Sequence, residues 1–247
     1  MPDTWRIVDD LGTSLDAAGQ MAADLALLDE VAEGAPPALR VYRWSRPALS
    51  LGRFQRDDDV DDAGCRRHGV EVVRRPTGGR ALLHGADLTY AVAMPRPSGA
   101  QGSVDAVYLL LAGALTVGLA RLGVEAAVAR SGGPAGPVCF ASQQGADLRV
   151  GERKLCGSAQ VHRDGVVLQH GALLLDRLPF DETDLLRGAG MSEGRTRLRS
   201  ATVTMQELGA PTDVRRVAGA LVDGFAEALD LRWTSLGRQP GAVAWTR

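Results

Sequence analysis

A chain of 247 residues, 45% hydrophobic and 23% charged, has the composition of a globular protein and is long enough to bury a sizeable core. Its formal net charge of −2 provides no basic field that would attract nucleic acid or anionic lipid. The longest apolar run, residues 106–120, is shorter than the roughly 20 residues that cross a bilayer. The acidic N-terminus is unlike a secretion signal, so we expect a cytoplasmic protein.

In chain order, the first predicted element is a helix from Ser14 to about Glu33, with Thr13 and Asp16 spaced like a capping box. Residues 38–44 (ALRVYRW) follow two prolines and are predicted to form a strand. We expect a short acidic helix over about Asp58 to His68. Two further strands are then predicted, from residues 69–75 (GVEVVRR) and 86–95 (ADLTYAVAMP).

The second half begins with a helix that Ser103 caps and that extends through Leu122. A β-meander is predicted over residues 146–175, with turns at Gly151-Glu152 and Asp164-Gly165. The last predicted helix runs from Thr212 to about Leu231. Because helices and strands mix without βαβ regularity, the sequence predicts an α+β fold in which helices flank a mixed, mostly antiparallel sheet.

The stretch RRPTGGRALLH, residues 74–84, joins two of these strands. It matches neither the P-loop nor the dinucleotide-binding pattern. The pair Gly78-Gly79 would permit positive φ and a close approach of backbone amides to a ligand. A tight turn between two strands is an equally good interpretation of this spacing.

Lys154 comes just past a predicted hairpin turn and is followed by small residues at 157–159. This arrangement suits a substrate that lies flat on the strand with its carbonyl or phosphate against the ammonium. The competing interpretation is a solvated lysine at a strand end. His84 and His170 are candidate acid–base groups or hydrogen-bonded structural histidines.

His68 and His162 are interpreted as surface residues, and four dispersed histidines do not predict a metal site. Three cysteines without CxxC spacing predict neither a disulfide framework nor a zinc site. Cys65, in a predicted helix, and Cys156, in a predicted strand, are interpreted as packing residues. Cys139 lies in a loop after glycines and prolines, which makes it a candidate nucleophile, with inert packing as the alternative.

Four segments together resemble the superfamily of lipoate ligases, biotin ligases and octanoyltransferases. They occur in that superfamily's order and are residues 21–30 (MAADLALLDE), 39–55 (LRVYRWSRPALSLGRFQ), 72–92 (VVRRPTGGRALLHGADLTYAV) and 151–176 (GERKLCGSAQVHRDGVVLQHGALLLD). The resemblance covers about residues 14–230. It implies one catalytic domain over 1–247, of the biotin and lipoate protein ligase type, without a separate C-terminal accessory domain.

Two chemistries compete within this superfamily. Ligases activate a free acid with ATP, whereas octanoyltransferases take octanoate from acyl carrier protein through an enzyme cysteine and use no nucleotide. Arg80 stands where similar ligases usually show a third glycine, and the chain ends soon after Leu231. Cys139-Phe140 resembles the acyl-accepting site of LipM-type octanoyltransferases, and Lys154 follows 15 positions later as in that pattern. The segment 139–150 (CFASQQGADLRV) departs from the pattern after its cysteine.

The resemblance therefore implies an octanoyltransferase of lipoate biosynthesis, with Cys139 as the acyl-thioester nucleophile and Lys154 as the cation that lowers its pKa and orients the carbonyl. The donor would be octanoyl-acyl carrier protein, and the acceptor the glycine-cleavage H protein or another lipoyl domain. No cofactor and no metal are expected. The implied substrate-binding residues are Arg75, Thr77, Gly78, Gly79, Arg80, His84, Gly157, Ser158, Ala159, Gln160 and His170.

Three alternatives stay open. They are an ATP-dependent lipoate or octanoate ligase, an amidotransferase between lipoyl domains, and a non-enzymatic protein that binds lipoyl domains or an acyl group. Apolar side chains that are candidates for lining the acyl channel are Leu82, Leu83, Val92, Leu173 and Leu175, and core packing is the competing interpretation for each.

Overall fold

The structure of this chain is a computed structural model that describes residues 2–129, 147–187 and 191–235. Within these ranges the strands form two sheets. The larger has eight strands in the spatial order β11-β1-β2-β6-β10-β9-β8-β7, which span Arg232–Ser235, Thr4–Asp10, Ala38–Tyr42, Asp87–Pro95, Val166–Leu174, Arg153–Arg163, Leu148–Val150 and Ala127–Val128. The smaller has the order β4-β3-β5, which span Glu71–Arg74, Ala48–Leu51 and Leu82–His84.

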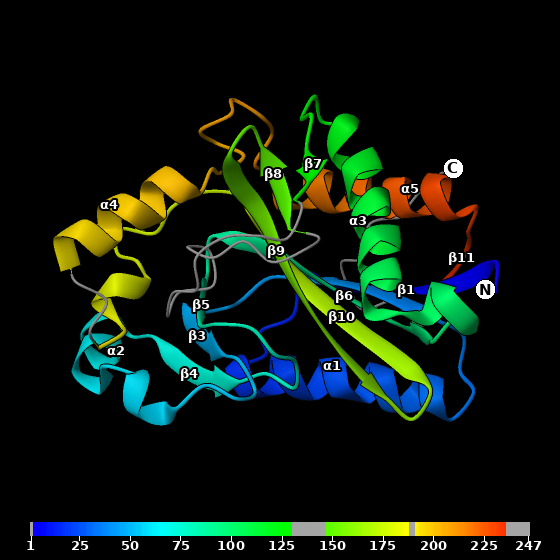
Figure 1. The fold of residues 1–247 in the computed structure, drawn as a ribbon, viewed down its shortest axis with the longest axis horizontal. Helices are drawn as coiled ribbons and strands as arrows, with labels where there is room; N and C mark the ends of the chain where they lie inside the picture. The colour runs from blue at the N-terminus through cyan, green and yellow to red at the C-terminus, as the bar shows by residue number, and fades with distance from the viewer. Residues whose placement is uncertain (1, 130–146, 188–190, 236–247) are drawn as a thin grey trace.

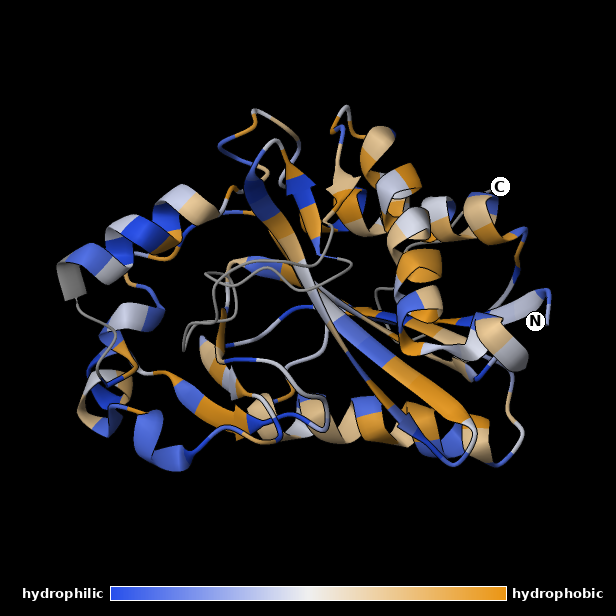
Figure 2. Ribbon diagram, in the orientation of Figure 1, coloured by the Kyte–Doolittle hydropathy of each residue, from blue (hydrophilic) through white to orange (hydrophobic). Residues whose placement is uncertain are grey.

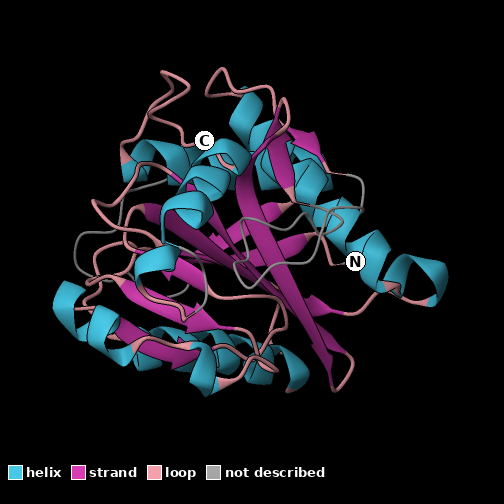
Figure 3. Cartoon of the chain, turned by 60° about the vertical axis from the view of Figure 1, so that its left-hand side comes forward, coloured by secondary structure: helices cyan, strands magenta, loops and turns pink. Residues whose placement is uncertain are grey.

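Helices cover both faces of the large sheet (Figures 1 and 3). Helix α1, Ala17–Ala32, lies on one face, while α3, Val104–Ala120, and α5, Val214–Leu229, pack together on the other. The shorter helices α2, Asp62–His68, and α4, Met191–Ala201, lie near the small sheet. No helix in the described ranges is long and apolar enough to span a membrane.

The large sheet is mixed. Strands β2, β6, β10, β9, β8 and β7 pair antiparallel in turn, whereas β1 pairs parallel with both β2 and β11. The α+β fold with a mixed, mostly antiparallel sheet is therefore confirmed. Each face of the sheet has its own core. One contains Tyr90 of β6 and Phe225 of α5, and the other contains Tyr42 of β2 and Met21 of α1. Figure 2 shows the contrast between α3, apolar over much of its length, and the hydrophilic α4.

The predicted β-meander is confirmed as β8, β9 and β10. Asp164 and Gly165 both have positive φ, at 52° and 76°, as expected for the favoured two-residue hairpin turn. Ser103 caps α3 by accepting a hydrogen bond from the amide of Ala106 at 3.2 Å, as predicted. The start of α1 was predicted too early, because Asp16 is the N-cap itself and accepts from the amide of Gly19 at 2.7 Å.

The glycine loop, residues 75–81, connects β4 to β5. These two strands do not pair with each other, because β3 lies between them. The loop does join two strands, as the turn interpretation has it, but those strands are not neighbours in the sheet, so the loop is not a hairpin turn. The loop instead crosses the end of β3 so closely that a Cβ added at Gly52 would meet the carbonyl oxygen of Gly79 at 2.0 Å. This crossing brings the loop against β10 of the large sheet, through the contact of Thr77 with His170.

Candidate active site

A cavity of about 490 Å³ lies between α1, the glycine loop and the face of β9 and β10. Met21, Trp44 and Leu82 contribute apolar surface, and Ala172 contributes a small side chain from β10. The predicted site residues that line the cavity are Arg75, Gly79, His84, Lys154, Gly157, Ser158, Ala159 and His170.

Arg75 holds the glycine loop in shape. Its guanidinium donates to the carbonyl oxygen of Ser50 at 2.8 Å, to that of Gly78 at 2.9 Å and to that of Arg80 at 2.6 Å. Gly79 has φ of +92°, and a Cβ there would meet the Arg75 guanidinium at 2.8 Å. The positive φ predicted for the glycine pair thus occurs at Gly79 but not at Gly78.

His170 belongs to a buried chain of hydrogen bonds that joins α1, β10 and the glycine loop. Its Nδ1 donates to a carboxylate oxygen of Asp24 at 2.9 Å, and its Nε2 contacts the hydroxyl of Thr77 at 2.7 Å. Asp24, with no exposed surface, also accepts from the Tyr42 hydroxyl at 3.0 Å and from Arg40 at 2.8 Å. Three polar partners on one buried carboxylate fix the orientation of Asp24 and, through it, the position of the His170 ring.

His84 belongs to a second chain of the same kind. Its Nδ1 donates to Asp87 at 2.9 Å, and its Nε2 lies 2.9 Å from the hydroxyl of Ser50, which in turn accepts from Arg75 at 3.1 Å. Burial raises the pKa of Asp87, but the interaction with His84 and the hydrogen bonds from the Gly85 amide and the Thr89 hydroxyl together outweigh burial, so that the pKa of Asp87 lies below its ordinary value. The His84 ring stacks on Trp44, with centroids 4.2 Å apart. Both histidines therefore line the cavity and are also fully hydrogen-bonded.

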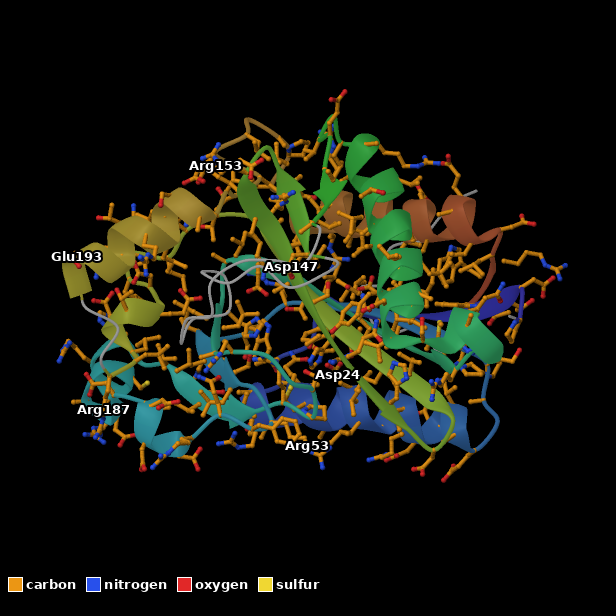
Figure 4. The ribbon with its side chains drawn as sticks, viewed as in Figure 1. Asp24, Arg53, Asp147, Arg153, Arg187 and Glu193 are labelled. Carbon is orange, nitrogen blue, oxygen red and sulfur yellow. The ribbon has the colours of Figure 1, made fainter. Side chains whose placement is uncertain are left out.

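Lys154 is buried, with only 1% of its side chain exposed, so the interpretation as a solvated strand-end lysine is wrong. Its Nζ lies 2.8 Å from a carboxylate oxygen of Asp147, whose side chain is 2% exposed. Both residues line the cavity, and Figure 4 shows Asp147 near the middle of the molecule beside the strands. Sequence reasoning missed Asp147, because an aspartate beside a short strand has the local pattern of a solvated residue.

The two described cysteines are packing residues, as predicted. Cys156 is 1% exposed, and burial, with the nearby Asp147 carboxylate, raises the pKa of its thiol to about 12. Cys65 is 4% exposed, and burial raises its thiol pKa as well. Neither thiol lines the cavity. The candidate nucleophile Cys139 lies outside the described residues.

Four predicted binding residues do not line the cavity: Thr77 is buried behind His170, Gly78 and Arg80 flank Gly79, and Gln160 pairs with Gln169 at 2.7 Å. Of the five apolar channel candidates, only Leu82 lines this cavity. Val92, Leu173 and Leu175 belong to the core under α3 and α5, so core packing is the correct interpretation for them. His68 and His162, predicted at the surface, are half-buried.

A second cavity, of about 540 Å³, contains the fifth channel candidate, Leu83. It is lined by residues of β5, of the segment after β10 and of α4. Glu182, only 6% exposed, also lines it and accepts from the amide of Leu83 at 3.2 Å. Burial raises the pKa of this carboxyl to about 7.

Comparison with known proteins shows the family to which this chain belongs. Residues 16–226 match the family described as lipoyl protein ligase A/B catalytic domain. The chain is 40% identical to the protein named Octanoyltransferase LipM of Kyrpidia tusciae, over 93% of this chain and 88% of that one. It is 36% identical to that of Carboxydothermus hydrogenoformans (94% and 88%) and 38% identical to that of Symbiobacterium thermophilum (95% and 89%).

The fold is shared with solved lipoate ligases. A putative lipoate protein ligase of Thermoplasma acidophilum with bound lipoic acid superposes with a TM-score of 0.76 at 23% identity, covering 95% of this chain and 89% of that one. A lipoate-protein ligase A bound with ATP gives a TM-score of 0.74 at 23% identity, covering 96% and 90%. The fold implied by the resemblance is thereby confirmed. With its sequence matched over most of its length, this chain belongs to the lipoyl protein ligase A/B catalytic domain family, among relatives named LipM octanoyltransferases.

Proposed function

We propose that this chain is a cytoplasmic octanoyltransferase of lipoate biosynthesis. It moves octanoate from acyl carrier protein, through a cysteine thioester, to a lysine of a lipoyl domain. Relatives named octanoyltransferase, similar over nearly the whole chain, support the reaction class. The observation that carries the proposal is the buried amine of Lys154, which lines a cavity together with small and apolar side chains. An apolar acyl chain fits such walls, and its carbonyl can meet the cation.

In the first step of the proposed reaction, Cys139 supplies the nucleophile. A free thiol has a pKa near ~8.5, so only a few per cent is thiolate at neutral pH. The positive charge of Lys154 favours the thiolate and lowers that pKa. The thiolate attacks the octanoyl carbonyl, the bond to the pantetheine sulfur breaks, and the pantetheine thiolate leaves with the electron pair and then takes up a proton.

Backbone amides of Gly78-Gly79 or Gly157-Ser158 are the proposed donors to the developing oxyanion, an interaction that contributes roughly 3–4 kcal/mol in enzymes where it was removed. One thioester replaces another, so the first step needs no ATP. In the second step a neutral acceptor lysine attacks the acyl-enzyme, the Cys139 thiolate leaves with the electron pair, and the proton lost by the lysine nitrogen returns to that thiolate or goes to solvent. The amide product is more stable than the thioester, which drives the transfer forward.

Substitution of single cysteines tests the assignment. Cys139→Ala is expected to eliminate transfer from octanoyl carrier protein to an acceptor lipoyl domain. Cys156→Ala is expected to retain most of it, because that thiol is buried outside the cavity with a pKa raised to about 12. Equal loss in both variants, with both folded by circular dichroism, would remove Cys139 from the nucleophilic role.

The main rival function is an ATP-dependent ligase. A solved structure with the same fold, a lipoate-protein ligase A bound with ATP, is the reason to test it. Modification of the acceptor from free octanoate and ATP, with none from octanoyl carrier protein, would select the ligase. Transfer from one octanoylated lipoyl domain to another, again with none from the carrier protein, would select an amidotransferase. The proposal predicts modification of the acceptor with octanoyl carrier protein as the donor and without ATP.

A further inference from the structure

Lys154 is the only lysine in the 247 residues, and the other 27 of the 28 basic lysine and arginine side chains are arginine. An arginine keeps its charge almost anywhere, whereas a lysine amine loses its proton readily when it is buried. The single lysine amine of the chain is thus placed where burial disfavours its charged form. Its charge in the cavity depends on its surroundings.

The structure supplies a counter-charge for this amine. The carboxylate of Asp147 lies 2.8 Å from Nζ of Lys154, and both side chains are at least 98% buried. An opposite charge at this distance in a low-dielectric site favours the ammonium and opposes the effect of burial. We propose that Asp147 is a positioning residue that keeps Lys154 an ammonium ion and points it into the acyl cavity.

The backbone around the pair is fixed from two sides. Strand β8 pairs with β9 through Arg149 and Lys154, with a register shift between Leu148 and Arg149. Such an irregularity redirects side chains locally. On the other side, the amide of Val203 donates to the carbonyl oxygen of Lys154 at 2.9 Å. With its main chain held this way, the Lys154 side chain is directed by the Asp147 carboxylate that its Nζ contacts.

The pair also suits the substrate. Asp147 and Lys154 together bring no net charge to the cavity, so the walls remain compatible with an apolar acyl chain. The ammonium nevertheless keeps a local positive potential that attracts the carbonyl oxygen and any negative charge that develops on it. This catalytic consequence rests on the proposed function, whereas the pairing and its effect on the Lys154 pKa do not.

The single lysine allows a direct test. Protein labelled with carbon-13 at lysine Cε gives one lysine side-chain signal, whose pH titration reports the protonation of Lys154. The wild-type signal is expected to be that of an ammonium ion at pH 7. Asp147→Asn removes the carboxylate and keeps the side-chain shape, and it is expected to lower the pKa by about one to three pH units. Asp147→Glu restores the charge and is expected to recover most of the shift.

Glu152→Gln is the matched control. Its side chain is 92% exposed, only two residues before Lys154, and its ion pair with Arg149 is solvated. It loses the same charge and is expected to leave the titration of Lys154 unchanged. A neutral Lys154 at pH 7 in the wild type would overturn the proposal, and so would equal titrations in the wild type and Asp147→Asn. The wild-type measurement decides even if the Asn variant does not fold.

Activity then separates this inference from the function. Asp147→Asn is expected to lower kcat for octanoyl transfer and to move its pH profile, while KM for the acceptor changes little. A shifted lysine titration in a protein without any octanoyl transfer would refute the proposed function and leave the pairing intact. If Asp147→Asn left the lysine titration unshifted while the protein transferred octanoate fully, the role of Asp147 would be refuted and the proposed function would stand.

Discussion

Replacing Glu182 by glutamine is expected to stabilise the protein at pH 8 but not at pH 4.5. Glu182 begins the short 3-10 helix Glu182–Asp184 and is 6% exposed in the second cavity. Burial raises its pKa from an ordinary 4.5 to about 7, while backbone hydrogen bonds, including the one from the Leu83 amide, oppose the rise without cancelling it. Glutamine keeps an acceptor for that amide and has no charge to bury.

The sign and size follow from proton binding. Below pH 4.5 the carboxyl is protonated in both the folded and the unfolded chain, so ionisation costs nothing. Between pH 4.5 and about 7 only the unfolded chain ionises, and the free energy of unfolding falls by about 1.36 kcal/mol per pH unit. Above about pH 7 the cost is constant, at about 3 kcal/mol as an upper limit.

The assay is equilibrium unfolding in urea at a series of pH values from 4.5 to 8, for the wild type and Glu182→Gln. The variant's advantage is expected to grow from near zero to at most about 3 kcal/mol, which for a chain of this size corresponds to a melting temperature higher by about 6–12 °C. Glu152→Gln, at a side chain that is 92% exposed, is the control and should show no such trend. A difference between wild type and Glu182→Gln that does not vary with pH would refute the reasoning.

Two further predictions compare matched pairs of substitutions. Asp24→Asn weakens the buried ion pair with Arg40 and is expected to lower the free energy of unfolding in urea by about 3–5 kcal/mol. Asp29→Asn, on the same helix, loses only an exposed ion pair and should lower it by less than about 1 kcal/mol. Gly79→Ala should lower the melting temperature, since its φ of +92° costs a non-glycine residue about 1–2 kcal/mol; Gly78→Ala, whose Cβ meets nothing within 4 Å, should not. Equal effects within either pair would contradict these arguments.

Local signals predicted the central part of the fold well. The β-meander over residues 146–175 has alternation and a strong turn dipeptide, and Ser103 is a standard helix cap, so neighbouring residues specify both. The edge of the large sheet could not be found in this way. Strands β1 and β11 pair in parallel although Thr4 and Arg232 lie at opposite ends of the sequence, and only the assembled fold brings them together.

Some residues of the site could likewise be predicted from local patterns, and others could not. Residues with reactive chemistry in distinctive local patterns, such as Lys154 and the glycine loop, were predicted, and the loop and lysine meet in one cavity. The acids that hold them, Asp24, Asp87 and Asp147, were not. A single carboxylate in a helix or beside a strand has the local pattern of a solvated residue, and its partner is a distant side chain that becomes visible only when the sheet is assembled.

The central claim is that an enzyme thiol carries the octanoyl group without help from ATP. Intact-protein mass spectrometry after mixing the chain with octanoyl carrier protein, in the absence of ATP, tests it most directly. The account predicts a mass increase of one octanoyl group, which hydroxylamine removes and which Cys139→Ala lacks. No adduct on the wild type, or an adduct that forms only from free octanoate and ATP, would contradict it.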